Sequence, residues 1–214
     1  MSKLHALADS LTSRLNEGLP EIWLLHGYGS HEGDLFSFES ALPQHGIRSL
    51  KAPIDLAMGG QAWYDIHWDA DGLKSEDMVQ VKDAMALIVD ALKGIDGPPP
   101  LLFGFSQGGI LANAIAWNHP DLIAGSIAVC SYFPHNWPVI DLTSQPVSKP
   151  LFMAVGDHDG VIPASRSMPT YEVLGEAIQE QLTVKSYPMA HSIHPTCFRD
   201  ILSWIALHGL NAKT

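Results

Sequence analysis

Three things are scarce in this sequence: cysteine, long apolar runs and positive charge. The 214 residues include two cysteines, Cys130 and Cys197, and neither lies in a C-x-x-C pair. We therefore expect both to be reduced, structural residues of a cytoplasmic protein. No apolar run approaches the roughly 18–20 residues of a membrane span, and residues 1–9 lack the apolar core of a signal peptide.

Positive charge is outweighed by negative charge. The chain has 12 Lys and Arg against 23 Asp and Glu, a formal net charge of −11. Nucleic acids and anionic membrane surfaces attract positively charged proteins, so neither is expected as the main partner. With 46% hydrophobic residues the chain has enough apolar surface to fold, and its length fits a single domain over residues 1–214.

The stretch 101–109 has the pattern of a serine on a sharp turn. The unbroken apolar run 101–105 predicts a strand buried on both faces, and the apolar and small residues after Ser106 predict a helix. Ser106 lies between Gly104 and Gly108, where side chains would clash with the adjoining strand and helix. Such a turn exposes the hydroxyl at the positive end of a helix, which favours a nucleophile. A glycine-rich turn with an incidental serine is the alternative.

Short apolar runs alternate with helical patterns along the whole chain. The predicted strands are 21–25, 47–51, 101–105, 123–130, 151–155 and 182–187. The predicted helices are 3–16, 35–42, 74–93, 107–118, 167–181 and 196–207. This alternation is typical of a mostly parallel sheet with helices on both faces. In such sheets the functional groups gather at the carboxyl ends of the strands.

The predicted strand ends carry a serine, an acid and a histidine. Ser106 comes first, Asp157 and Asp159 follow a later strand, and His191 follows the last one. This chain order is the one found in nucleophile-elbow hydrolases. A serine hydroxyl is a poor nucleophile until a histidine takes its proton, and a carboxylate behind the histidine fixes its tautomer. Asp159 is favoured over Asp157 as that carboxylate, because Val-Ile-Pro follows it at 161–163.

An oxyanion formed during acyl transfer needs N–H donors already in place. Two backbone N–H groups are candidates. One belongs to Gln107, which follows the serine, and the other to Tyr28, in the glycine-rich turn after the first strand.

Two long stretches, 54–73 and 131–149, have no clear period. Long irregular segments in compact proteins are usually functional, so 54–73 is interpreted as a flap over a pocket. A satellite hydrophobic cluster under a loop is the alternative. Trp63 and Phe133 are the suggested lining of an acyl pocket.

Eleven histidines invite a metal-site hypothesis. His191 and His194 have an H-x-x-H spacing, with Asp157 and Asp159 as further ligands. A helical zinc site instead uses H-x-x-x-H with a glutamate, and Pro195 disfavours a helix through these histidines. We therefore expect no metal and no cofactor.

Four motifs resemble the phospholipase/carboxylesterase family of α/β-hydrolases, which includes small bacterial carboxylesterases and acyl-protein thioesterases. They are Leu25-His26-Gly27-Tyr28-Gly29 with Asp34-Leu35, Gly104-Phe105-Ser106-Gln107-Gly108-Gly109, Asp159-Gly160-Val161-Ile162-Pro163 and His191-Ser192-Ile193. The segment Gly60-Gln61-Ala62-Trp63-Tyr64-Asp65 also resembles that family's substrate-side loop. The resemblance implies an α/β-hydrolase fold with Ser106 as nucleophile, Asp159 as acid and His191 as base. It also implies that Tyr28 and Gln107 form the oxyanion hole.

Residues 3–16 depart from that family's usual start, which is a strand hairpin. Their apolar positions share one helical face, and that face packs on the chain's own core or on a second subunit. The sequence leaves both arrangements open, and with them a homodimer.

The sequence thus predicts a cofactor-independent serine hydrolase that cleaves carboxylic esters or thioesters. A carboxylesterase for small or medium acyl chains is the first interpretation, with a small molecule or an acylated molecule as substrate. An acyl-protein thioesterase and a lysophospholipase are the alternatives within this class. A non-catalytic ligand-binding protein on a hydrolase scaffold is the alternative from another class.

Overall fold

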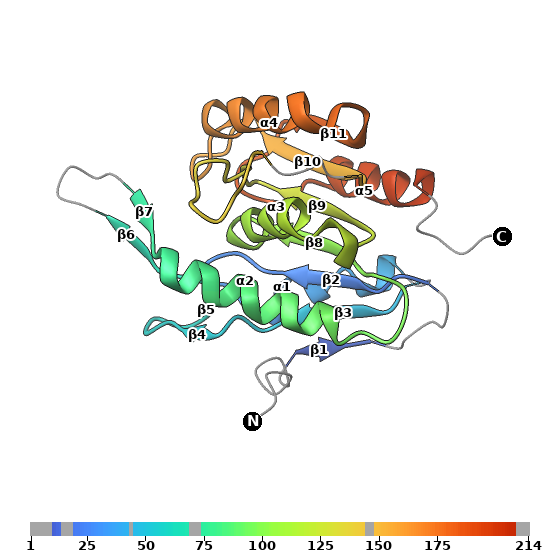
Figure 1. The fold of residues 1–214 in the computed structure, drawn as a ribbon, viewed down its shortest axis with the longest axis horizontal. Coiled ribbons are helices and arrows are strands. Elements are labelled where there is room, and N and C mark those ends of the chain that lie inside the picture. Colours follow the sequence, from blue (N-terminus) through green and yellow to red (C-terminus); the bar gives the residue numbers. More distant parts are fainter. Residues whose placement is uncertain (1–9, 14–18, 43–44, 69–73, 144–147, 209–214) are drawn as a thin grey trace.

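A computed structural model of the chain describes residues 10–13, 19–42, 45–68, 74–143 and 148–208 (Figure 1). These residues contain a seven-stranded sheet in the order β1-β3-β2-β8-β9-β10-β11. Its strands are β1 (Leu11–Thr12), β2 (Ile22–Leu25), β3 (Ile47–Leu50), β8 (Leu101–Phe105), β9 (Gly125–Val129), β10 (Leu151–Gly156) and β11 (Leu182–Tyr187). All neighbours from β3 to β11 are parallel, and only β1 is antiparallel to its partner. The predicted mostly parallel sheet is confirmed.

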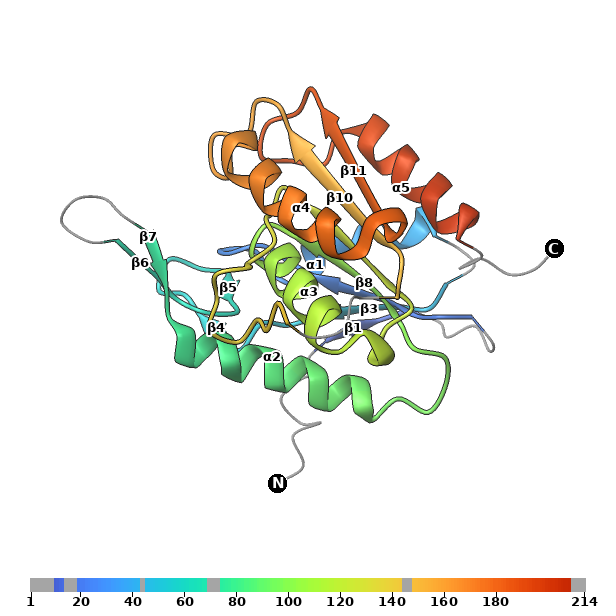
Figure 2. The ribbon, with the colours of Figure 1, turned by 45° about the horizontal axis from the view of Figure 1, so that its top comes forward.

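Helices cover both faces of this sheet (Figures 1 and 2). The α-helices are α1 (Glu32–Phe36), α2 (Met78–Lys93), α3 (Gln107–Asn118), α4 (Ala164–Ile178) and α5 (Pro195–Leu207). Short 3₁₀ turns lie at η2 (Glu39–Ala41), η3 (Pro120–Leu122) and η4 (Gln179–Gln181). Helices α2, α3 and α4 pack on one face, and α1 and α5 pack on the other. No helix of the described ranges is both long and apolar enough to cross a bilayer.

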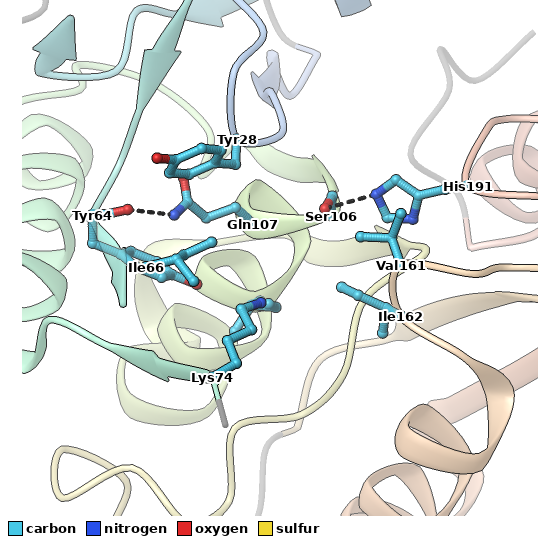
Figure 3. A pocket seen from close by; sticks show the side chains of 10 residues that line it. Tyr28, Tyr64, Ile66, Lys74, Ser106, Gln107, Val161, Ile162 and His191 are labelled. Carbon is cyan, nitrogen blue, oxygen red and sulfur yellow. Dashed lines mark hydrogen bonds between the residues drawn. The ribbon is translucent and has the colours of Figure 1, made fainter. Parts of the chain in front are cut away.

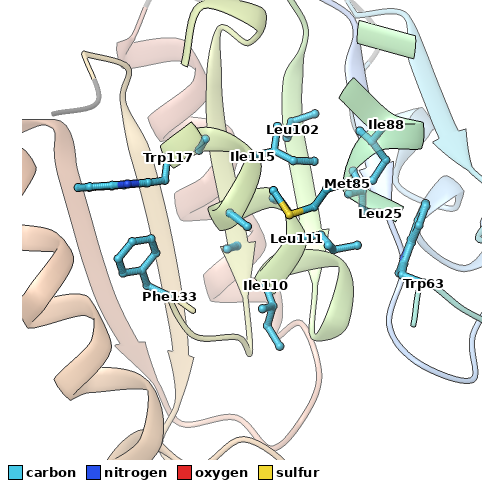
Figure 4. Close-up of a cluster of buried hydrophobic side chains, with 14 of the residues drawn as sticks. Leu25, Trp63, Met85, Ile88, Leu102, Ile110, Leu111, Ile115, Trp117 and Phe133 are labelled. Atoms are coloured by element: carbon cyan, nitrogen blue, oxygen red, sulfur yellow. The ribbon is translucent and has the colours of Figure 1, made fainter. Parts of the chain in front are cut away.

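The apolar runs of the strands divide between two cores, one on each face. In β2, Trp23 and Leu25 point into the core beneath α2 and α3, while Ile22 and Leu24 point into the core beneath α1 and α5. This alternation is the ordinary geometry of a strand. Figure 4 shows the first of these cores, with side chains of α2 and α3 meeting those of the sheet. Burial on both faces explains why the strands read as unbroken apolar runs.

The helix predicted for residues 3–16 is wrong in the part that the structure describes. Leu11 and Thr12 form strand β1 and pair with Ser49 and Arg48 of β3. The edge of β3 presents unpaired backbone groups, and pairing them outweighs a weak local helical pattern. The remaining residues of that predicted helix, apart from 10 and 13, lie outside the described residues.

The stretch 54–73 contains short strands in place of an irregular loop. A first hairpin joins β4 (Ile54–Asp55) to β5 (Gln61–Ala62), and a second joins β6 (Ile66–Trp68) to β7 (Lys74–Glu76). Residues 69–73 lie outside the described ranges. The helix predicted from residue 74 begins at Met78, because the Asp77 side chain accepts the N–H groups of Val79 and Gln80 and caps it there.

Candidate active site

Ser106 sits on a strained turn between β8 and α3, with φ 53° and ψ −119°. Non-glycine residues rarely adopt positive φ, and such strain is stored where function requires it. The two glycines beside it have no room for a side chain. A Cβ on Gly104 would overlap the carbonyl oxygen of Gly108, and a Cβ on Gly108 would overlap that of Leu25. The glycines let β8, α3 and β2 approach closely enough to hold this turn.

A continuous hydrogen-bonded chain joins the three predicted residues. Ser106 Oγ lies 2.9 Å from His191 Nε2 (Figure 3), and His191 Nδ1 lies 2.8 Å from Asp159 Oδ2. Both distances lie within the usual hydrogen-bond range. The structure therefore brings together a hydroxyl, an imidazole and a carboxylate in the geometry that activates a serine.

Backbone hydrogen bonds hold the Asp159 carboxylate in place. Its Oδ1 accepts the N–H groups of Val161 and Ile162, each at 2.8 Å, so Oδ2 is left for His191. Burial alone would raise the pKa of Asp159, but the hydrogen bonds from His191, Ile162 and Val161 outweigh it and lower the pKa below its usual value. Asp157 is exposed, and no hydrogen bond joins its side chain to His191. The structure thus places Asp159, and not Asp157, behind the histidine.

The glycine-rich turn after β2 lies directly against the serine. A Cβ on Gly27 would come within 3.3 Å of Ser106 Cβ. Buried His26 supports the turn: its Nδ1 lies 2.9 Å from Gly27 O, and its Nε2 lies 3.4 Å from Ala52 N. Since a backbone N–H can only donate, His26 Nε2 accepts and Nδ1 carries the proton. Burial lowers the pKa of His26, which keeps this supporting ring neutral.

The predicted oxyanion donors face this arrangement from two sides. Gln107 is the first residue of α3, where a helix leaves its N–H groups unsatisfied. Tyr28 lies in the glycine-rich turn, and its neighbour Gly29 donates its N–H to Gln61 O at 2.9 Å. Within the described part of the chain, the backbone N–H groups of Tyr28 and Gln107 have no protein acceptor.

The Gln107 side chain ties the serine turn to the hairpins. Its Oε1 accepts the Trp63 N–H at 2.9 Å, and its Nε2 donates to Tyr64 O at 2.7 Å. The first hairpin is also joined to the glycine-rich turn, because Gln61 N–H donates to Ser30 O at 2.7 Å. These buried hydrogen bonds fix the segment between the hairpins relative to Ser106.

A cavity of about 360 Å³ opens beside Ser106 (Figure 3). Its lining comes from the two glycine turns, the hairpin segment, α3 and the loop after β10: Tyr28, Tyr64, Ile66, Lys74, Ser106, Gln107, Ile110, Val161, Ile162 and His191. A second cavity of about 270 Å³ is also lined by His191, together with Phe105, Ser192 and Ile193. Ser106 lines only the larger of these two cavities.

Neither Trp63 nor Phe133 lines the cavity beside Ser106, contrary to the sequence-based suggestion. Trp63 is buried behind it, with its indole Nε1 donating to His26 O at 3.0 Å. Phe133 packs against Trp117 at a ring distance of 5.3 Å and belongs to the core. Both aromatic rings are therefore part of the buried core on this face of the sheet.

Lys74 is a polar lining residue to which the sequence assigned no role, whereas Tyr64 lies in the segment 60–65, which resembles the family's substrate-side loop. Lys74 carried the pattern of a helix start, and Tyr64 was one of several aromatic residues in an irregular stretch. Three apolar lining residues lie in or next to recognised motifs: Val161 and Ile162 belong to the motif that begins at Asp159, and Ile110 directly follows the Ser106 motif. No sequence signal indicated that they share one cavity.

One group of side chains has the composition of a metal site. Ligand atoms of Cys130, Asp159 and His191 lie within 4.8 Å of one another. Both ring nitrogens of His191 are already engaged, and burial raises the pKa of the Cys130 thiol, which disfavours the thiolate that a metal would need. These donors suit the hydrogen-bonded chain better than a metal ion. Cys130 and Cys197 are both free and buried, as the sequence predicted.

Comparison with known proteins agrees with this geometry. Residues 17–209 match the phospholipase/carboxylesterase family, and the chain belongs to that family. Membership places it among the ester and thioester hydrolases.

Individual relatives are more distant. The chain is 28% identical over 175 residues to acyl-protein thioesterase 1 of Mycosarcoma maydis, covering 72% of each chain. Its fold is similar to that of Zea mays acyl-protein thioesterase 2, with a TM-score of 0.75, 17% identity and coverage of 93% of this chain and 98% of that one. The Bacillus cereus carboxylesterase gives a TM-score of 0.69 at 16% identity, covering 97% and 100%. At such identities the two structures support the fold alone.

Proposed function

We propose that the chain is a serine carboxylesterase for small or medium acyl chains, with Ser106 as nucleophile, His191 as base and Asp159 as its orienting acid. The observation that carries the proposal is the hydrogen-bonded chain from Ser106 Oγ through His191 to Asp159 at the mouth of a cavity. We further propose that the enzyme works in the cytoplasm without a metal or other cofactor, in keeping with its free, buried cysteines.

The reaction has two acyl-transfer steps. As Ser106 Oγ bonds to the substrate carbonyl carbon, His191 Nε2 takes its proton, and the carbonyl oxygen becomes an oxyanion bound by the N–H groups of Tyr28 and Gln107. The tetrahedral intermediate then expels the alcohol or thiol, which receives the proton from Nε2, and an acyl-serine remains. Water gives a proton to Nε2 as it attacks the acyl-serine, and collapse returns that proton to Ser106 and releases the acid.

The size of the cavity favours short acyl groups. A volume of about 360 Å³ lies near the lower end of the roughly 300–1,000 Å³ found for small-molecule sites. A long fatty acyl chain, as in a lysophospholipid or a lipidated protein, needs a longer groove. The observation that favours thioesterase activity is the 28% identity to a fungal acyl-protein thioesterase.

Hydrolysis of matched oxoesters and thioesters with acyl chains of two to sixteen carbons tests the proposal. We expect kcat/KM to peak at short or medium chains and to vanish in Ser106→Ala, while Ser203→Ala, on the exposed side of α5, keeps the wild-type values. A steady rise to sixteen carbons would instead favour an acyl-protein thioesterase or a lysophospholipase. An intact fold without turnover of any substrate would favour a non-catalytic binding protein.

A further inference from the structure

The cavity beside Ser106 has an apolar side and a polar end. Ile66, Ile110, Val161 and Ile162 give it apolar walls. The Lys74 ammonium group reaches the same space from β7, and Figure 3 shows Lys74 at the end of the cavity away from His191. An ammonium group inside a mostly apolar cavity is unfavourable unless something pairs with it.

Lys74 has no partner of its own in the described residues. The nearest carboxylate, on Glu76, is already used: its Oε1 accepts the Tyr132 hydroxyl at 2.6 Å and lies 3.6 Å from Arg166 Nη2. Arg166 in turn stacks on the Tyr132 ring, with its Cζ 4.3 Å from the ring centroid. Among the described residues, Arg166 therefore pairs with this carboxylate and Lys74 has no ion-pair partner, in a chain whose net charge is −11.

A second polar group at this end also lacks a partner. The Tyr64 side chain is buried, and its hydroxyl is among the buried side-chain atoms without a hydrogen-bond partner. Such orphaned groups are rare in folded proteins, because each loses its hydrogen bonds to water without gaining a replacement. The hydroxyl points towards the Lys74 end of the cavity in Figure 3, and both groups are close enough to Glu76 and Arg166 to feel their charges.

Both unpaired groups can donate hydrogen bonds. Burial raises the pKa of Tyr64 well above its usual value, so the phenol keeps its proton. Burial and the Arg166 charge lower the pKa of Lys74, while Glu76 opposes them, so a bound anion would strengthen the ammonium form. One cation beside one neutral donor suits the two oxygens of a single carboxylate.

The lining of the two cavities indicates which part of a substrate lies near Lys74 and Tyr64. Ser106 and both proposed oxyanion residues line the larger cavity, so the acyl group lies there. His191, which gives its proton to the leaving group, also lines the smaller cavity, so we assign the alcohol or thiol to that cavity.

We propose that this enzyme prefers an acyl group that ends in a carboxylate, which Lys74 and Tyr64 bind at the far end of the cavity. Its substrates are then hemiesters or hemithioesters of short dicarboxylic acids. This inference rests on the proposed esterase function, and it adds the substrate class.

Three methyl esters of matched length test it. They are monomethyl adipate, its neutral primary amide and methyl hexanoate, with acid release measured in a pH-stat. We expect wild-type kcat/KM to be at least about tenfold higher for the hemiester than for the amide, since a hydrogen bond to a charged group is worth about 1.5–3 kcal/mol. Lys74→Met should lower the hemiester-to-hexanoate ratio by about 10- to 100-fold, and Tyr64→Phe by a smaller factor.

Lys82→Met removes an exposed lysine of α2 that does not line this cavity, and it should leave the ratio unchanged. Lys74→Arg keeps the charge and should retain most of the preference, which separates loss of charge from a folding defect. Equal hydrolysis of all three esters, with no change of ratio in Lys74→Met, would overturn the substrate class and leave the esterase function standing. If no ester is cleaved and a fluorophosphonate fails to label the protein, the proposed function fails, and this inference with it.

Discussion

The turn that carries Ser106 and the hairpin segment that faces it are built in different ways. The turn is held by backbone packing at the ends of β2, β8 and α3, where Gly104 and Gly108 leave no space for a side chain. The segment between the hairpins is held by side-chain hydrogen bonds, chiefly from Gln107 to Trp63 and Tyr64. Backbone packing tolerates almost no substitution, whereas a segment held by side chains accepts changes in what it presents. In the proposed function the first region carries out the chemistry, and the second region sets the substrate.

Replacing Asp159 with Asn tests the chemical half of this comparison and has the largest expected effect. The amide cannot stabilise the imidazolium and favours the wrong tautomer of His191, so kcat should fall by about 10⁴-fold. Because the change lies in the chemistry, the fall should be the same for a hemiester and for methyl hexanoate. Steady-state kinetics on both esters measures it. A loss confined to one ester would show that Asp159 acts on substrate choice.

Gly108→Ala tests the claim that the serine turn has no room. The new Cβ would overlap the carbonyl oxygen of Leu25, so the backbones of β2 and α3 must separate, at a cost of at least about 3 kcal/mol. Urea unfolding monitored by circular dichroism measures this loss. Gly97→Ala is the matched control, because a Cβ there meets nothing within 4 Å. Equal stability of the two variants would contradict the packing account.

Gln107→Met tests the connection between the two regions. The substitution keeps the backbone N–H of residue 107 but leaves the Trp63 N–H and the Tyr64 carbonyl unpaired, at about 1–3 kcal/mol for each buried group. We expect faster amide hydrogen exchange at Trp63 and a kcat/KM roughly tenfold lower. Gln181→Met, at an exposed position, should change neither. Unchanged exchange at Trp63 would mean that the hairpin segment is held by other contacts.

The smallest expected effect is on the acid dependence of stability. The folded-state pKa of Asp159 is lowered, so its ionised form stabilises the fold above the unfolded pKa of about 3.9. That contribution is lost as the pH falls through the lower, folded-state pKa. The stability difference between the wild type and Asp159→Asn should be constant above about pH 5 and shrink below about pH 4. Urea unfolding at several pH values measures it, and a difference that grows towards low pH would contradict the assignment.

The contrast between the two regions also explains what the sequence could predict. The central strands β2, β8 and β10 were predictable because burial on both faces produces unbroken apolar runs. The positions of Ser106, Asp159 and His191 followed, because parallel strands bring their carboxyl ends to one edge. The cavity did not follow, because two- and three-residue strands such as β5 and β7 are too short to show a period.

Two errors have specific physical causes. Leu11 and Thr12 lie in a helical pattern, yet the free edge of β3 draws them into the sheet, and pairing at such long sequence range leaves no local trace. Trp63 suggested a pocket wall because a large aromatic side chain in an irregular stretch is unfavourable in water and must be buried against something. The Trp63 side chain is instead buried in the core, where its indole N–H donates a hydrogen bond to His26 O. Tyr64 and Lys74 reach the cavity because of the path that the chain takes around the short strands β5 and β7. The sequence does not show that path.

The most direct test of the central claim is the site of covalent attachment. The wild-type protein is treated with a fluorophosphonate, digested and mapped by mass spectrometry, with Ser106→Ala treated in parallel. The account predicts one adduct per chain, located on the 101–118 segment at Ser106, and no adduct in the variant. A single adduct on another serine, or equal labelling of a folded Ser106→Ala variant, would contradict it.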